Sequence, residues 1–127
     1  ARVSSARAQA APARVCAMDG GSCKIALQRV IDLDPERCFD AWLSDVWIGG
    51  GGCGPAPRIV KEGDAVSGEG CVRAVPGGIH EEILASTRGR SIEYHIKSGP
   101  FPVSYHRGRV DFEPHGQGAT LVTWTCS

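Results

Sequence analysis

The sequence predicts a single α+β domain in which a curved antiparallel sheet of about seven strands packs against a helix. Three observations lead to this prediction. The chain has 127 residues, enough for one domain with one hydrophobic core. One amphipathic helical segment lies in its first half, between a strand-like stretch and a series of short β-prone runs. Turn signals separate those runs at spacings that suit strands joined as neighbours.

Residues 1–18 differ in composition from the rest, and we predict that the domain spans 19–127. The segment is rich in Ala and Arg, contains two Ser and has no acidic residue. This composition resembles the remnant of an organelle transit peptide, and it lacks the apolar core of a signal peptide. A flexible arm is the alternative. The predicted location is therefore a plastid or mitochondrion, or otherwise the cytoplasm, and the protein is expected to be soluble.

The first predicted strand leads directly into the helix. Its apolar residues alternate with others at the period of a strand with one buried face: Ile25, Leu27, Ile31 and Leu33. Asp34 is suited to be the N-cap of a helix, and Pro35 is suited to its first position. Apolar residues then recur at helical spacing as far as Val46, so we expect this helix to lie on the sheet.

The chain after the helix is predicted to form six further strands. Glycine fills most of 49–54, which we predict to be a mobile loop. The strands are expected near 58–62, 70–75, 79–86, 91–97, 103–113 and 119–126. Because about ten residues separate successive runs, an antiparallel meander is the simplest connection.

Charge and cysteine content exclude several classes of partner. Fourteen basic residues balance fourteen acidic ones, so we predict no nucleic-acid partner. No apolar run approaches the roughly 20 residues of a membrane-spanning helix. The six cysteines show no CxxC pair, which favours reduced buried thiols over disulfides or a metal site. We predict no metal and no cofactor.

Several stretches together resemble a known family in their order and spacing. They are VIDLDPE at 30–36, VKEG at 60–63, GEGCVR at 68–73, IHEEI at 79–83, YHI at 94–96, GPFPV at 99–103 and GATLVTW at 118–124. Over about 23–126 the chain resembles the START/Bet v 1-like (SRPBCC) superfamily, in particular its polyketide cyclase/dehydrase-type members.

The resemblance implies a helix-grip fold, in which an N-terminal helix pair and a long C-terminal helix enclose a pocket against the sheet. Because the sequence ends at Ser127, we expect the C-terminal helix to be missing or truncated. The resemblance also implies a function: binding of a small hydrophobic ligand that is lipid-, polyketide- or isoprenoid-like. The alternatives are a cyclase/dehydratase-like enzyme and an interaction subunit whose open sheet face docks on a protein partner.

A bent sheet leaves space beneath a helix, and an apolar cavity there is the default small-molecule site. We expect inward-facing side chains of the helix and of the strands at 91–97 and 119–126 to line it. The predicted ligand-binding residues are Phe39, Trp42, Ile92, Tyr94, Ile96, Val122 and Trp124. The competing interpretation is that these residues fill a solid core.

The strand at 103–113 carries the weak catalytic candidates. Inward-facing Tyr105 and Arg107 would hold a ligand oxygen, but the outward orientation is favoured because Val110 and Phe112 compete for the core. His106 is the candidate acid or base. GxSxG and HExxH motifs are absent from the sequence, and the glycine run at 49–54 is not followed by the Lys-Ser/Thr that a P-loop requires, so a binding protein is favoured over an enzyme.

Overall fold

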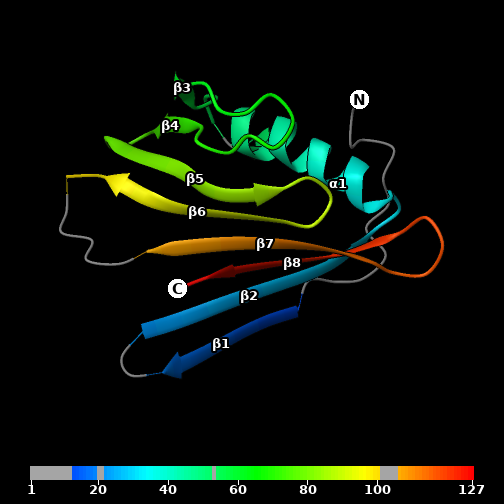
Figure 1. Cartoon of the computed structure of the whole chain (residues 1–127). Coiled ribbons are helices and arrows are strands. Elements are labelled where there is room, and N and C mark those ends of the chain that lie inside the picture. Colours follow the sequence, from blue (N-terminus) through cyan, green and yellow to red (C-terminus); the bar gives the residue numbers. More distant parts are fainter. Residues whose placement is uncertain (1–12, 20–21, 53, 101–105) are drawn as a thin grey trace.

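A computed structural model describes residues 13–19, 22–52, 54–100 and 106–127. Eight strands form one antiparallel sheet in the order β1-β2-β8-β7-β6-β5-β4-β3, which confirms the predicted α+β class (Figure 1). The strands are β1 (Ala13–Asp19), β2 (Ser22–Ile31), β3 (Arg58–Lys61), β4 (Val72–Val75), β5 (Ile79–Thr87), β6 (Ser91–Ser98), β7 (Arg107–Pro114) and β8 (Thr120–Cys126). Each of the seven predicted strands is present, with bounds that differ by a few residues, although 103–105 lie outside the described residues.

The sequence did not predict β1, which lies mostly within the segment 1–18 that we assigned to a leader. It pairs with β2 in an antiparallel register from Ala13 opposite Gln28 to Asp19 opposite Ser22. Strand pairing uses backbone groups, so an edge strand can form without an alternating apolar pattern. The ordered sheet therefore begins before residue 19, while the leader prediction for residues 1–12 lies outside the part that the structure describes.

The predicted helix begins where expected, and only its first part is α-helical. In α1 (Pro35–Ala41), the Asp34 carboxylate caps the first turn by accepting a hydrogen bond of 2.9 Å from the Arg37 backbone N–H. The chain then continues without a break into wider π-helical turns, η2 (Trp42–Ile48). After Gly49 a short turn follows, η3 (Gly50–Gly52), whose glycines have positive φ angles and are therefore not a continuation of the helix. The expected helix pair is thus one continuous helical segment, and within the described chain no helix follows β8.

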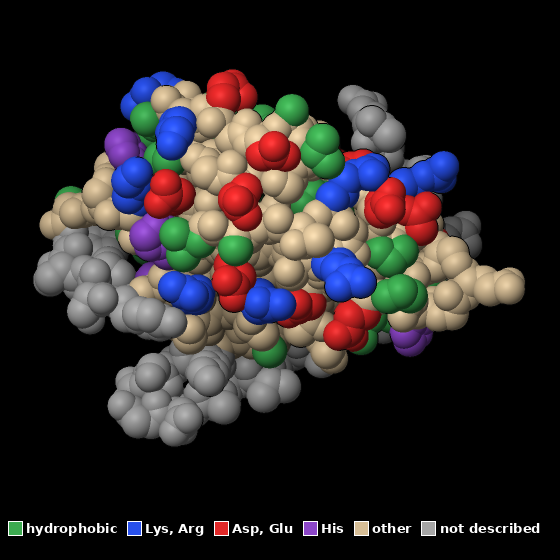
Figure 2. All heavy atoms as spheres, viewed as in Figure 1, with side chains coloured by type: hydrophobic (Ala, Val, Ile, Leu, Met, Phe, Trp, Pro, Cys, Tyr) green, Lys and Arg blue, Asp and Glu red, His purple; other side chains and the backbone are tan. Residues whose placement is uncertain are grey.

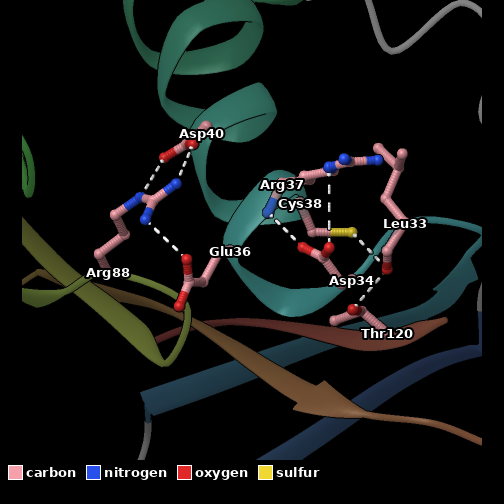
Figure 3. Close-up of polar contacts among 8 residues, drawn as sticks. All are labelled: Leu33, Asp34, Glu36, Arg37, Cys38, Asp40, Arg88 and Thr120. Carbon is pink, nitrogen blue, oxygen red and sulfur yellow. Dashed lines mark hydrogen bonds and ion pairs between the residues drawn. The ribbon is translucent and has the colours of Figure 1, made fainter. Parts of the chain in front are cut away.

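Ion pairs tie the first turns of the helix to the turn between β5 and β6. Arg88 lies between two acidic side chains of α1, with 2.7 Å to Glu36 Oε2 and 2.7 Å to Asp40 Oδ2 (Figure 3). The hydrogen bonds from Arg88 hold the pKa of Asp40 below its usual value. All three side chains are substantially exposed, so this contact contributes orientation more than stability.

A buried contact fastens the same end of the helix to β8. The Thr120 hydroxyl donates a hydrogen bond of 2.7 Å to the Leu33 carbonyl oxygen, and the Cys38 thiol donates to the same oxygen at 3.5 Å (Figure 3). Thr120 is fully buried, and this bond satisfies its hydroxyl. Burial raises the pKa of the Cys38 thiol, which favours the neutral form that can donate this bond.

Arg73 of β4 holds the other end of the helical segment. Its guanidinium forms a 2.8 Å ion pair with Glu81 of β5 and donates to the backbone carbonyls of Val46, at 3.1 Å, and Trp47. It also lies 4.1 Å from the centre of the Trp47 ring, in cation–π geometry. A cation beside the last carbonyls of a helix is favourable, so Arg73 fixes where the helix ends over the sheet.

The densest packing lies between the helix and the half of the sheet made by β5, β6 and β7. Phe39 and Trp47 are fully buried and contact the rings of Phe112 and Tyr94, each with ring centres 5.5 Å apart. The strands supply Ile83, Ile92 and Val110, which are at most 1% exposed.

A glycine on β7 makes room for the Tyr94 ring. A Cβ atom at Gly108 would lie only 2.1 Å from a carbon of that ring, and the two residues are opposite each other in the sheet. The ring therefore lies flat on β7, where a larger residue at position 108 would displace it.

The surface carries charges of both signs. On the face shown in Figure 2, Lys and Arg side chains are interspersed with Asp and Glu and form no extended patch of one sign. This distribution agrees with the balanced composition. Among the described residues, no helix is long and apolar enough to cross a membrane.

Candidate ligand pocket

A pocket of about 710 Å³ opens between the helical segment and the β2–β8 half of the sheet. Most of its lining residues are apolar. They are Leu27, Gln28, Arg29, Ile31 and Leu33 from β2 and the segment after it, Cys38, Ala41, Trp42, Ser44, Asp45 and Val46 from the helical segment, Gly49, Gly51 and Gly52 after it, and Phe112, Val122 and Trp124 from β7 and β8.

Strand register explains which side chains form the floor. Leu27 of β2 lies opposite Trp124 of β8, and Arg29 lies opposite Val122. Directly opposed residues in an antiparallel pair share one face, so these four side chains lie on the face that the helix covers elsewhere. Since Phe39 and Trp47 pack onto β7 and β6, much of the floor made by β2 and β8 stays open.

Trp42 forms the wall that separates the pocket from the packed core. Its ring stacks on Trp47, with centres 6.3 Å apart, and meets the edge of Trp124 at 5.5 Å and 79°. Trp124 in turn donates a hydrogen bond of 2.8 Å from its indole N–H to the Tyr94 hydroxyl. The indole nitrogen of Trp42 is buried and has no hydrogen-bond partner in the part of the chain that the structure describes. The wall is therefore a set of packed aromatic rings that borders the pocket on one side and the core on the other.

Glycines border the pocket beyond the end of the helix. Gly51 and Gly52 have φ angles of 72° and 78°, a left-handed conformation that glycine adopts without strain. A Cβ atom at either position would meet no neighbouring atom within 4 Å. The sequence predicted a loop here, and the structure places this loop beside the pocket.

Two charged residues, Arg29 and Asp45, are part of the lining. Arg29 is on the sheet side and is exposed, whereas Asp45 is on the helix side and accepts a hydrogen bond of 3.3 Å from the Ser44 hydroxyl. They do not form an ion pair with each other within 4.0 Å. Polar groups are thus present in an otherwise apolar pocket, as ligand sites require for orientation.

The structure divides the seven residues predicted to bind ligand between pocket and core. Trp42, Val122 and Trp124 line the pocket. Phe39 and Ile92 are completely buried in the core, and Tyr94 is 5% exposed beside them. Ile96 is half-buried on β6, opposite Glu81 and away from the pocket.

The catalytic candidates do not gather in the pocket lining. The outward orientation that we favoured for β7 is confirmed for its described part, because Val110 and Phe112 are buried, Arg107 is exposed and Arg109 pairs with Glu93 at 2.8 Å. Tyr105 lies outside the described residues.

His106 faces the inner side, next to a buried phenol. Its ring centre is 6.2 Å from that of Tyr94, and its Nδ1 is buried and has no hydrogen-bond partner among the described residues. The Tyr94 hydroxyl is also 3.7 Å from the Cys126 sulfur. Burial raises the pKa of Tyr94, so its hydroxyl keeps its proton at neutral pH.

Sequence reasoning missed the contribution of β2 and of the last helical turns. Leu27, Ile31 and Leu33 carried a signal, since we recognised their alternation as a strand with one buried face. Arg29 and Asp45 carried none, because a single charged residue in either element is ordinarily solvated. Their place in the lining follows only from the three-dimensional packing.

The three cysteines whose side chains the structure describes are free thiols: Cys38, Cys71 and Cys126. Cys38 and Cys71 are buried, as small apolar residues would be, and Cys71 accepts a hydrogen bond of 3.3 Å from the Trp47 indole. Within the described ranges, no three His, Cys, Asp or Glu side chains come together as metal ligands would.

Solved structures similar to this chain share its fold. CalU16 from Micromonospora echinospora aligns with a TM-score of 0.60 at 14% identity, over 92% of this chain and 68% of its own. A protein from Nitrosospira multiformis aligns with a TM-score of 0.62 at 22% identity, over 82% and 77%. An HSP90 activator from Plasmodium falciparum gives 0.58 at 17%, over 82% and 71%.

No curated protein matches the sequence. A family does: residues 22–127 match the family described as polyketide cyclase / dehydrase and lipid transport. This match extends from the first residue of β2 to the end of the chain and includes every element that forms the pocket. The chain therefore belongs to the polyketide cyclase / dehydrase and lipid transport family, in agreement with the resemblance of its sequence motifs to polyketide cyclase/dehydrase-type proteins.

Proposed function

We propose that the protein binds a small hydrophobic molecule in the pocket between the helical segment and strands β2 and β8. The observation that supports this proposal most strongly is the pocket itself, of about 710 Å³ and with a mostly apolar lining. Small-molecule sites in proteins have volumes of about 300–1,000 Å³ and combine apolar walls with a few polar groups. The family's description, which includes lipid transport, agrees with such a ligand.

Packing supports the proposal by a second route. Apolar side chains in the pocket, among them Leu27, Ile31 and Val122, are only half-buried, whereas Tyr94 and Cys71, which contact Trp47, are at most 6% exposed. Covering the exposed part of each apolar side chain would gain roughly 25 cal/mol per Å² removed from water. A hydrophobic ligand in this pocket would therefore bury apolar surface that the folded protein leaves exposed to water.

A cyclase- or dehydratase-like activity is the second candidate, and one observation favours it. Trp124 lines the pocket and also bonds the Tyr94 hydroxyl, beside which His106 has an unpartnered buried nitrogen. A histidine and a phenol linked to a substrate pocket could direct proton transfer. If this is the function, His106→Ala would lower turnover of a poly-carbonyl substrate at least a hundredfold, and unchanged turnover would remove the candidate.

Native mass spectrometry of the full chain, purified gently from its source, tests the binding function. We expect a mass increment of a few hundred daltons that disappears after extraction with organic solvent. The extracted protein should then take up the neutral dye Nile red at a ratio near one. A co-purifying polypeptide in place of the small molecule would instead indicate the interaction role. Extracted protein that takes up neither Nile red nor dodecanol would contradict the proposal.

A further inference from the structure

One charged residue of the pocket floor has no partner among the described residues, and we infer that it selects the ligand: Arg29 makes the pocket specific for apolar molecules with an anionic head group. This inference rests on the proposed function, because it assigns the ligand class of the same pocket. It follows from where Arg29 lies, from what its guanidinium does not contact, and from what a bound apolar chain would do to it.

Arg29 occupies an inward position on β2. Successive side chains of a strand alternate between faces, so Leu27, Arg29 and Ile31 project on the same side. Arg29 lies directly opposite Val122 of β8, and all four residues line the pocket. A cation between two apolar residues on the inner face is unusual, because an apolar side chain would fit position 29 as well as it fits positions 27 and 31.

The other arginines that contact neighbouring elements are all paired. Arg73 binds Glu81 at 2.8 Å, Arg88 binds Glu36 and Asp40 at 2.7 Å each, and Arg109 binds Glu93 at 2.8 Å. Among the described residues, Arg29 has neither a side-chain hydrogen bond nor an ion pair. Its five N–H donors are therefore available to a ligand.

A bound apolar chain would change the surroundings of this cation. A ligand body that covers Leu27, Ile31 and Val122 lies on both sides of the Arg29 stem and removes water from it. Taking a charge out of water without a partner is costly, whereas a carboxylate can accept two parallel hydrogen bonds from a guanidinium. A ligand that brings its own oxyanion avoids this cost, and a neutral one does not.

Asp45 is the one acidic side chain of the lining, and it makes the sign of the head group testable. It already accepts a hydrogen bond from the Ser44 hydroxyl, so part of its capacity is used within the protein. A cationic head group would be drawn to Asp45 and repelled by Arg29. An anionic head group would bind on the sheet side of the pocket, away from the helix.

Three ligands with the same twelve-carbon chain separate these possibilities: dodecanoate, dodecanol and dodecyltrimethylammonium. Their dissociation constants would be measured by quenching of tryptophan fluorescence at neutral pH and low salt, since Trp42 and Trp124 line the pocket. We expect dodecanoate to bind about tenfold more tightly than dodecanol, and the ammonium compound to bind most weakly. The preference for dodecanoate should shrink as salt is added.

Variants assign the preference to one side chain. Arg29→Gln should lower dodecanoate affinity about tenfold and raise dodecanol affinity, because the neutral ligand then no longer covers an unpaired cation, and Arg29→Lys should keep part of the preference. Arg58→Gln, at an exposed arginine of β3 outside the lining, is the matched control and should bind like the wild type. Circular dichroism of each variant would show that it is folded, which we expect because Arg29 is exposed.

Each result has a distinct meaning. Equal affinities for dodecanoate and dodecanol, with no effect of Arg29→Gln, would overturn the head-group inference and leave the binding function standing. Tightest binding of the ammonium compound would overturn it in favour of Asp45. Failure of all three ligands to bind would contradict the proposed function itself.

Discussion

The two halves of the inner sheet face differ in how they are filled. On β5–β7, the side chains beneath the helix are at most 5% exposed, and the rings of Phe39 and Trp47 occupy the space above them. On β2 and β8, side chains with the same inward orientation border a pocket of about 710 Å³. The helix path explains the difference, since Arg73 and Arg88 hold it to β4 and to the β5–β6 turn.

This comparison separates two properties that a strand pattern does not distinguish. Alternation determines which side chains face inward, and it is the same in both halves. Whether an inward side chain becomes core or pocket wall depends on what lies above it. One sheet can therefore provide stability on one half and a binding surface on the other.

The largest expected effect comes from shortening an isoleucine in each half. Ile92→Ala in the packed half should lower the free energy of unfolding by about 3 kcal/mol or more, because a rigid core leaves a cavity. Ile31→Ala, at the pocket, should cost under about 1.5 kcal/mol, since water already reaches that side. Urea denaturation of both variants measures the difference. Similar losses would show that the two halves are equally packed.

Gly108→Ala tests the packing of the Tyr94 ring on β7. Because the added methyl group would lie within 2.1 Å of the ring, we expect a loss of about 2–3 kcal/mol from overpacking. Gly99→Ala is the control, since its methyl group would meet its nearest neighbour, Ile79, at an ordinary 3.7 Å. Thermal unfolding that ranks both variants alike would mean that the ring does not lie against Gly108.

Removing the cation at the helix end should have a smaller effect. Arg73→Met leaves Glu81, only 14% exposed, without its partner, and frees the last helical carbonyls. We expect a loss of about 2 kcal/mol, below the roughly 3–5 kcal/mol for a fully buried pair. The double variant Arg73→Met/Glu81→Leu should recover part of it. If the double variant is no more stable than Arg73→Met, the unpaired carboxylate is not the cause.

The smallest effect is expected at the exposed contact of Arg88 with α1. Because the folded state lowers the pKa of Asp40, its contribution is present at pH values above the unfolded pKa near 4 and is lost as the pH falls through the lower folded value. Asp40→Asn should therefore be slightly less stable than the wild type at pH 7 and equally stable near pH 2. Acid titration of both by circular dichroism checks this. A gap that persists at pH 2 would exclude the carboxylate charge as its source.

The sequence was sufficient for the fold because local signals agreed with one another. The Asp34-Pro35 helix start, the six later strands and the burial of Val110 and Phe112 all followed from capping and alternation. The edge strand β1 was not predicted, because backbone pairing does not require an alternating apolar pattern and the composition of 1–18 indicated a leader. The sequence also could not predict which inward residues fill the core and which line the pocket. Ile92 and Val122 follow the same alternation, but only Val122 lines the pocket, because the course of the helix depends on contacts between residues far apart in the sequence.

The central claim is that the space above β2 and β8 is a binding pocket beside a separate packed core. Leu27→Trp tests it most directly, because Leu27 lines the pocket and lies outside the buried cluster and its packed neighbours. Dodecanol affinity and unfolding free energy would be measured together, with Leu84→Trp, on the exposed side of β5, as control. We predict at least tenfold weaker binding for Leu27→Trp with a stability change under about 1 kcal/mol. Unchanged dodecanol affinity in a folded Leu27→Trp protein would contradict the claim.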